Sequence, residues 1–108
     1  MEINTHEQSG ATVIELTGEV DLHNAKTLKA ELLKAAGQKK PVAVNLEKLT
    51  YIDSSGMATL VEGFNTAKQN KTKLALIAVN GAPLQVLKLT RLDSIFPMFG
   101  SVEAFLND

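Results

Sequence analysis

The residues best suited to chemistry in this sequence are the consecutive Asp53-Ser54-Ser55-Gly56. The apolar segment 42–46 precedes them, and the apolar residues after them recur at helical spacing, as Met57, Leu60, Val61 and Phe64. The two serines therefore lie where a strand is followed by a helix. The first turn of a helix has unpaired backbone N–H groups and the positive end of the helix dipole, so it favours negative charge. A serine hydroxyl at this position can cap the helix, bind a phosphate or become phosphorylated.

Helix capping is the plainest explanation of this motif. Asp and Ser are both common N-cap residues, and one of them is expected to cap the helix whatever the protein does. Gly56 is less expected in the first turn, because glycine lowers helix stability. It indicates a place where a partner approaches the backbone closely. Composition alone leaves the capping and the functional interpretations open.

Signatures of known enzyme sites do not fit around the serines. A nucleophile elbow requires Gly-x-Ser-x-Gly, but Ile52 stands at the first glycine position for Ser54, and Asp53 does so for Ser55. A phosphate-binding loop that ends in Gly-Lys-Ser or Gly-Lys-Thr is also missing. We therefore expect no catalytic residues, and nucleotide binding has no glycine loop to support it.

The remaining candidates for chemistry are histidines and acidic residues outside the motif. His6 and His23 lie far from it in sequence, and neither forms a metal-ligand pattern with nearby acids. Glu19 and Asp21 belong to a loop before the first predicted helix, where solvation and capping explain acidic side chains. We expect surface histidines, no metal site and no cofactor.

Length and charge limit the classes of partner. The chain has 108 residues, enough for one domain, residues 1–108, with a single core. Its net charge is −1 and its only basic block is Lys39-Lys40, whereas binding to nucleic acid phosphates needs clustered Lys and Arg. With no Trp and one Tyr, a platform for stacking bases is not expected either. We predict no direct contact with nucleic acid.

The sequence also predicts where the protein works. It contains no cysteine, which removes disulfides, thiolate metal sites and cysteine nucleophiles and fits a reducing compartment. The longest apolar run, residues 74–79, is too short to cross a bilayer. The first residues, Met1-Glu2-Ile3-Asn4, lack the pattern of a signal peptide. We expect a cytoplasmic protein that does not insert into membranes.

Strands and helices are predicted to alternate after an initial hairpin. β-Branched and apolar runs predict strands at residues 3–7, 12–17, 42–46 and 74–79, with an edge strand at 95–96. Loops are expected at residues 18–23 and in the polar stretch that follows residue 46 and ends in Tyr51-Ile52. Helices are predicted from the N-cap Asn24 to a stop at Gly37, from Ser54 to about Gln69, around Pro83, and after the cap Ser101. This order predicts an α/β fold with a mainly parallel central sheet, an N-terminal hairpin and about four helices.

The run from Tyr51 to Leu60, Tyr-Ile-Asp-Ser-Ser-Gly-Met-Ala-Thr-Leu, resembles the signature of STAS domains, specifically of bacterial anti-sigma factor antagonists. The likeness extends over essentially the whole chain. It includes Gly18-Glu19-Val20-Asp21 with Ala25 and Leu28, Val44-Asn45-Leu46, and the C-terminal Leu84, Leu87, Leu92 and Phe96. Met57 and Ala58 stand where Leu and Gly are common in the family, a change that bears on partner choice. The resemblance implies a STAS-type fold.

The resemblance also implies a partner-switching mechanism. In such proteins the serine directly after the aspartate, Ser54 here, is phosphorylated by a serine kinase that is also the anti-sigma factor. The unphosphorylated form binds this kinase and frees the sigma factor, and a serine phosphatase resets the phosphorylated form. The expected contacts with the partner are Asp21, Asp53, Ser55, Gly56 and Met57. The protein would act as a monomer with no catalysis of its own.

A second function is compatible with the same resemblance. Some STAS domains dock on a transporter, an ATPase or a larger signalling assembly without being phosphorylated. The presence of serine at position 54 favours the switch, because a docking domain does not require a phosphate acceptor there. A small enzyme or a nucleotide-binding protein is the third class that we considered.

Overall fold

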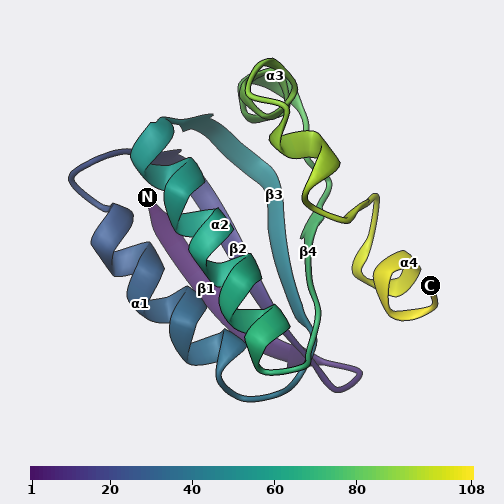
Figure 1. The fold of residues 1–108 in the computed structure, drawn as a ribbon. Coiled ribbons are helices and arrows are strands. Elements are labelled where there is room, and N and C mark those ends of the chain that lie inside the picture. The colour runs from purple at the N-terminus through teal and green to yellow at the C-terminus, as the bar shows by residue number, and fades with distance from the viewer.

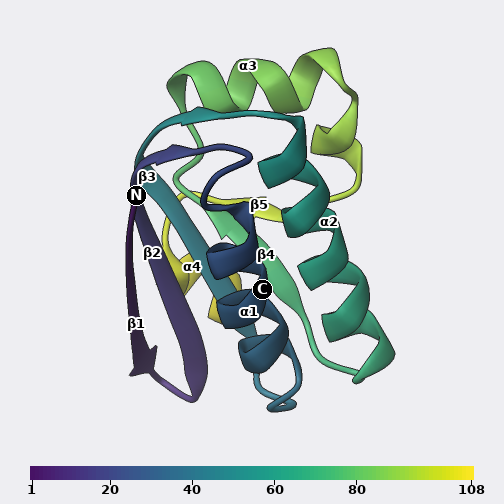
Figure 2. The ribbon, with the colours of Figure 1, turned by 90° about the vertical axis from the view of Figure 1, so that its left-hand side faces the viewer.

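The computed structural model describes residues 1–108 as a five-stranded sheet with four α-helices and one short 3-10 helix. Figures 1 and 2 show α1 and α2 side by side against one face of the sheet. The strands are β1 (Glu2–Gln8), β2 (Ala11–Val20), β3 (Val42–Ile52), β4 (Leu74–Ile77) and β5 (Met98–Phe99). The helices are α1 (Ala25–Ala36), α2 (Ser54–Gln69), α3 (Gly81–Leu89), η1 (Leu92–Ser94) and α4 (Val102–Leu106).

The sheet has the predicted mixed topology. Its strand order is β1-β2-β3-β4-β5, with β1 antiparallel to β2 and every later pair parallel. Ser9 and Gly10 form the hairpin turn with φ values of 52° and 84°, a conformation that glycine adopts without strain. The α/β class, the hairpin and the alternating order of elements are therefore confirmed.

The alternation of side chains along the central strands divides the core into two layers. Val42, Val44 and Leu46 of β3 point into the larger cluster, which α1 and α2 cover with Leu28, Leu32 and Leu60. Ala43, between them, points to the other face, where Val102 and Phe105 of α4 pack. A strand that is apolar at consecutive positions is thus buried on both sides, as its sequence predicted.

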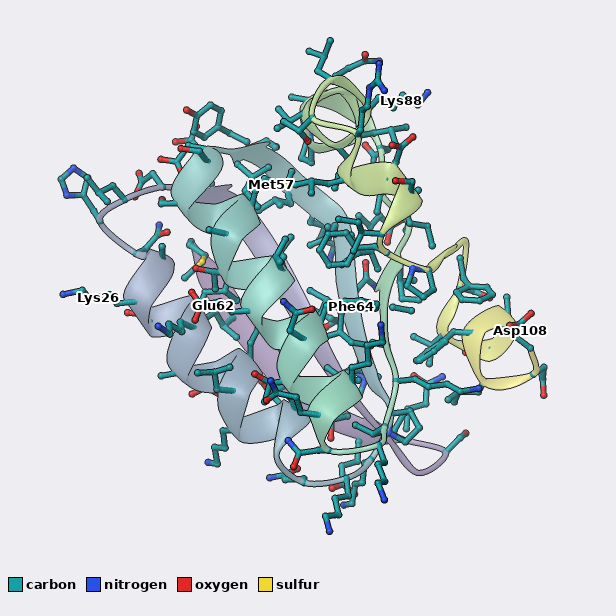
Figure 3. All side chains as sticks on the ribbon, in the orientation of Figure 1. Lys26, Met57, Glu62, Phe64, Lys88 and Asp108 are labelled. Carbon is teal, nitrogen blue, oxygen red and sulfur yellow. The ribbon has the colours of Figure 1, made fainter.

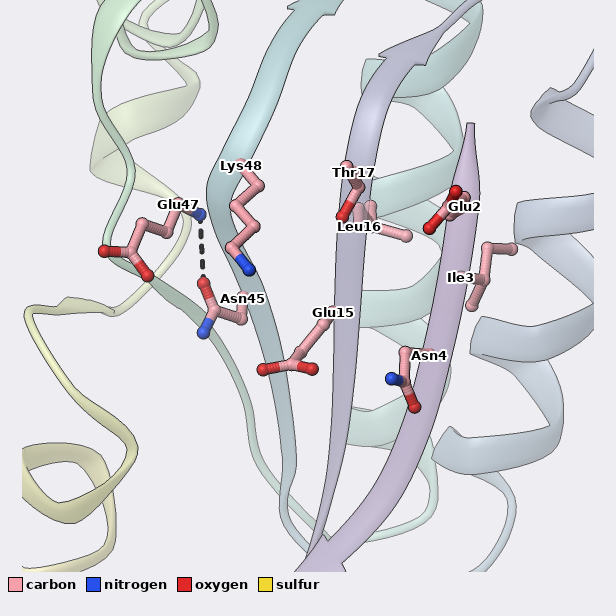
Figure 4. A pocket seen from close by; sticks show the side chains of 9 residues that line it. All are labelled: Glu2, Ile3, Asn4, Glu15, Leu16, Thr17, Asn45, Glu47 and Lys48. Carbon is pink, nitrogen blue, oxygen red and sulfur yellow. Dashed lines mark hydrogen bonds between the residues drawn. The ribbon is translucent and has the colours of Figure 1, made fainter.

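On the face of the sheet where α4 packs, one part of β1, β2 and β3 has no helix over it. Figure 4 shows the side chains that line the shallow hollow there, including Asn4, Glu15, Asn45 and Lys48, from neighbouring strands. The Asn45 side chain accepts a hydrogen bond from the Glu47 backbone N–H at 2.9 Å. These residues are polar because this part of the sheet is in contact with solvent, and α4 covers only the opposite end of the face.

Two strands extend further than the sequence predicted. The stretch at residues 47–50, predicted as a polar loop, belongs to β3, and residues 18–20, also predicted as loop, belong to β2. The two segments pair with each other, as Gly18 does with Leu49, and register shifts interrupt the ladder on either side of this pairing. These irregularities keep Leu49 and Ile52 buried although their spacing departs from strict alternation. Residues 47–50 are mostly polar, so the sequence pattern predicted a loop there in place of the strand.

The C-terminal segment also differs from its prediction. The edge strand is Met98–Phe99 rather than 95–96, because η1 occupies the preceding residues and Phe96 turns into the core. Pro97 instead accepts a hydrogen bond from the Leu76 N–H through its carbonyl, at 2.9 Å. β4 ends at Ile77, because Ala78 has a φ of 56°. Of the N-caps predicted at Asn24 and Ser101, Ser101 is confirmed, because its hydroxyl oxygen accepts a hydrogen bond from the Ala104 N–H at 3.1 Å. Asn24 precedes α1 but makes no side-chain capping bond.

Candidate functional site

The carboxylate of Asp53 organises the beginning of α2. Asp53 is the N-cap residue, with an extended backbone (φ −99°, ψ −174°). Its Oδ1 accepts hydrogen bonds from the Ser55 hydroxyl at 2.5 Å and from the Gly56 N–H at 3.1 Å. The same carboxylate oxygen therefore caps the helix and holds the Ser55 hydroxyl. The cap is what the capping interpretation of the motif predicts.

These bonds also set the charge of Asp53. The Ser55 hydroxyl is the largest cause that lowers the pKa of this carboxyl below its ordinary value, followed by the Gly56 N–H, while desolvation acts in the opposite direction. Hydrogen bonds donated to a carboxylate favour its ionised form. A negative charge therefore stands next to Ser54 at neutral pH.

The second oxygen of Asp53 holds a loop from another part of the chain. Oδ2 accepts a hydrogen bond from the Leu22 backbone N–H at 3.1 Å, which links the β2–α1 loop to the beginning of α2. The loop is also braced internally, because Asp21 Oδ1 accepts from the His23 N–H at 2.9 Å and Asn24 Oδ1 accepts from the Asp21 N–H at 2.9 Å. Asp21 thus shapes the loop beside the motif, and its side chain is only partly exposed.

The two serines have different environments. Ser55 is partly buried and its hydroxyl is engaged by Asp53. Ser54 is the first residue of α2, is exposed, and its hydroxyl has no hydrogen-bond partner. Ser54 therefore offers a free nucleophilic oxygen at the positive end of a helix of 16 residues.

Gly56 and Met57 lie behind the serines, inside the protein. A Cβ on Gly56 would be 2.6 Å from Ile52 Cγ1 and 2.7 Å from Val20 Cγ1, so the close approach at this glycine comes from the chain's own strands and not from a partner. Met57 is 4% exposed and belongs to the larger core cluster. Figure 3 shows its position near the beginning of α2. Gly56 and Met57 are thus buried in the free protein, and the exposed surface beside them belongs to their neighbours; a contact of either residue with a partner stays a prediction.

Two apolar side chains beside the motif escaped the sequence analysis. Leu22 is 74% exposed in the loop that Asp53 holds, and Tyr51 is 47% exposed near the end of β3. Met1, Leu89, Ile95 and Met98 are exposed as well, but Leu22 and Tyr51 are the two that lie beside the motif, where exposed apolar groups suit a contact surface. Neither residue has a local sequence signal: Leu22 belongs to no periodic apolar pattern, and the exposure of Tyr51 depends on how β3 packs.

The other candidate chemistries find no support in the arrangement of side chains. No group of three or more His, Cys, Asp or Glu side chains is placed to hold a metal ion. His6 and His23 are both exposed, and His6 lies on β1, away from the loop that contains His23. No helix has the length and apolar character needed to span a bilayer.

Comparison with known proteins decides the family. The family model described as STAS domain matches residues 2–105. The chain belongs to the STAS domain family. Its five-stranded sheet and four α-helices are the mixed α/β fold seen in the structural neighbours of this family.

Proteins similar in sequence to this STAS domain include several named as anti-sigma factor antagonists. The chain is 22% identical over 101 residues to an anti-sigma F factor antagonist of Paenibacillus polymyxa, covering 92% of this chain and 86% of the relative. It matches the structure of an anti-sigma factor antagonist from Mycobacterium paratuberculosis with a TM-score of 0.87 at 20% identity, over 98% of this chain and 91% of that one.

The STAS domain also resembles one antagonist solved in two states. SpoIIAA in its phosphorylated form, described as a Bacillus cell fate determinant, matches with a TM-score of 0.74 at 20% identity over 98% of this chain and 97% of its own. Its unphosphorylated form matches with a TM-score of 0.74 at 18% identity over 98% and 96%. The fold of this chain is therefore equally similar to both states of that protein.

Proposed function

We propose that this STAS domain is an anti-sigma factor antagonist that is switched by phosphorylation of Ser54. The observation that carries the proposal is the difference between the serines: the Ser54 hydroxyl is exposed and unengaged, whereas Asp53 holds that of Ser55. The names of the relatives supply the partner class, an anti-sigma factor. The choice of Ser54 agrees with the family resemblance, which implies that the serine directly after the aspartate is the phosphate acceptor.

In this proposal the protein is a binding module and not a catalyst. The unphosphorylated form binds an anti-sigma factor that is itself a serine kinase, and the sigma factor is released. Transfer of phosphate from ATP to Ser54 makes the complex dissociate, and a serine phosphatase restores the form that binds the anti-sigma factor. The protein acts as a monomer in the cytoplasm and does not contact nucleic acid.

The charge at the beginning of α2 explains how a single phosphate can release the partner without unfolding the domain. A phosphoserine adds roughly −1.5 to −2 charge at neutral pH. The beginning of α2 tolerates it because the helix dipole is positive there, so the fold of the domain is retained. A partner that binds this surface meets two neighbouring anionic groups, the phosphate and Asp53. A like charge about 4 Å away near a surface costs roughly 4 kcal/mol, and about 1.4 kcal/mol changes affinity tenfold.

The contact surface in this proposal centres on Ser54 and the apolar side chains beside it. Leu22 and Tyr51 supply exposed apolar area next to the acceptor, as anchor residues of interfaces commonly do. Asp53 and Ser55 are partly exposed at its edge, while Asp21 acts by fixing the loop. Gly56 and Met57 support the surface from behind.

Mapping the phosphate tests the proposal. The protein is incubated with ATP and the anti-sigma serine kinases of its host, and the modified residue is located by mass spectrometry. We expect phosphate on Ser54 in the wild type and in Ser55→Ala, and none in Ser54→Ala. Modification of Ser55 in place of Ser54 would contradict the assignment of the acceptor. No modification by any such kinase would favour a docking subunit of a transporter or larger assembly.

A further inference from the structure

A second site lies toward the far end of α2 from Ser54. Side chains of α2, β4, β5 and α4 enclose a pocket of about 320 Å³, which we call the aromatic pocket and define by Phe64, Leu74, Phe99 and Phe105. Figure 3 shows Phe64 on the side of α2 that faces the C-terminal segment, which ends at Asp108. Ser54 and Lys68, which lines the pocket, are separated by roughly 20 Å along the helix, at about 1.5 Å per residue.

The shortness of β5 creates this pocket. β5 has only two residues, and they pair with Leu76 and Ile77 of β4. Leu74 has a partner on β3 but none on β5, so the outer edge of β4 is open there. The backbone groups of Leu74 and Leu76 face the same edge of the strand, and the Leu76 N–H is bonded to Pro97 at that edge. The open edge adds polar backbone groups to an otherwise apolar wall.

The walls and the rim of the aromatic pocket have different chemistry. Phe99 and Phe105 pack with their ring centroids 5.5 Å apart, and Phe64 and Phe99 are only partly buried, so apolar ring surface lines the interior. Lys68 and Lys73 are exposed at the rim, and Lys71 lines the adjoining hollow under α4. The chain's two ion pairs, Lys29–Glu62 and Lys40–Glu7, involve none of these lysines.

Charge at the rim selects the ligand. Lys68 and Lys73 line the aromatic pocket together with one acidic residue, Asp108, and Lys71 lines the adjoining hollow with Lys73 and the same Asp108. An apolar pocket with free cations at its mouth matches a molecule with an apolar body and a single anionic head. We propose that the aromatic pocket binds a small monocarboxylate with an apolar tail, such as a medium-chain fatty acid. The tail lies among the phenylalanine rings and the carboxylate meets Lys68 and Lys73.

This site is independent of the proposed phosphorylation switch. It shares only the helix α2 with the motif, and none of its lining residues lies in the loop or strand ends around Ser54. Ligand binding here can therefore be tested on the purified protein without a kinase or an anti-sigma factor. If no ligand binds in the pocket, the assignment of Ser54 as the phosphate acceptor is unaffected. If Ser54 is not phosphorylated, the proposal for the pocket is unaffected.

A titration followed by amide chemical shifts tests the proposal. Octanoate is added to the protein, with octanol as the uncharged analogue of equal length. We expect saturable shifts of amides around Phe64, Leu74, Phe99 and Phe105 with octanoate, and weaker binding of octanol. Lys68→Gln combined with Lys73→Gln should weaken octanoate binding roughly three- to tenfold and leave octanol unaffected.

Lys26→Gln is the matched control, because Lys26 is exposed on α1, across the molecule from the pocket in Figure 3, and its loss should change nothing. The lysines are all exposed, so the variants keep the fold, which their spectra will report. Shifts that do not saturate, octanol binding as tight as that of octanoate, or full affinity in the double variant would each overturn the proposal.

Discussion

The Ser55 hydroxyl donates a hydrogen bond to the Asp53 carboxylate at 2.5 Å, and this bond distinguishes two adjacent serines that look equivalent in the sequence. Asp53 uses its other oxygen to hold the Leu22 N–H at 3.1 Å. One carboxylate therefore caps α2, fixes one serine and anchors a loop. Its neighbour Ser54 is left free at the surface.

Replacement of the carboxylate should make the effect of this charge visible as a pH dependence of stability. The pKa of Asp53 is lowered in the folded state by the Ser55 hydroxyl and the Gly56 N–H. Because the unfolded state binds the proton more tightly, the contribution of Asp53 is complete above its unfolded pKa of about 4 and is lost as pH falls through the folded pKa. Urea unfolding at several pH values should show wild type more stable than Asp53→Asn at pH 7, with the difference shrinking in acid. A difference that is constant with pH would contradict this role.

Two glycines of α2 should respond in opposite ways to alanine. In Gly56→Ala the new Cβ meets Ile52 and Val20 at 2.6 and 2.7 Å. Overpacking of this kind costs about 1–3 kcal/mol, and the gain in helix propensity, about 1 kcal/mol, offsets only part of it. We expect a net loss of up to roughly 2 kcal/mol in the free energy of unfolding.

Gly63→Ala is the matched control for that experiment. Its Cβ would lie 3.5 Å from its nearest neighbours, Leu32 and Leu74, which is ordinary contact. The variant should therefore be as stable as wild type or up to about 1 kcal/mol more stable, from helix propensity alone. Equal stability of the two variants in denaturant titrations would show that Gly56 is not required for packing.

Leu22→Ala should weaken partner binding without changing stability. The side chain is 74% exposed, and its hydrogen bond to Asp53 uses the backbone N–H, which alanine retains. Truncation of an apolar anchor at an interface costs about 1 kcal/mol or more, so affinity for the anti-sigma factor should fall at least about fivefold. Met98→Ala, at an exposed methionine on β5, should bind as wild type does. An unchanged affinity of Leu22→Ala would place Leu22 outside the contact surface.

The general architecture was predictable because its signals are local. Consecutive apolar residues in 42–46 and 74–79 identified strands that are buried on both faces, and helical periodicity after Asp53 identified α2. Ser101 was recognised as a cap from its type and position. Each of these inferences depends on residues within a few positions of each other.

The details that matter for the site depend on contacts between distant segments. The polar residues 47–50 form a strand only because β2 lies beside them, and Asp53 reaches Leu22 across 31 positions of sequence. The helical spacing of Met57 with Leu60 already indicated that its side chain faces the core, whereas no local pattern indicated that Gly56 packs against β2 and β3. The family resemblance already implied Ser54 as the acceptor, but the different environments of the two serines depend on one side-chain hydrogen bond, from Ser55 to Asp53. Spacing alone does not specify such a bond.

The affinity of the anti-sigma factor for the two states of the protein tests the central claim most directly. Protein phosphorylated on Ser54 and unmodified protein are each titrated with the anti-sigma kinase in the absence of ATP, and their melting temperatures are compared in parallel. We predict that the phosphorylated form binds at least roughly tenfold more weakly while its melting temperature stays nearly unchanged. Equal affinity of the two forms, or a weaker complex that is accompanied by loss of the fold, would contradict the proposed switch.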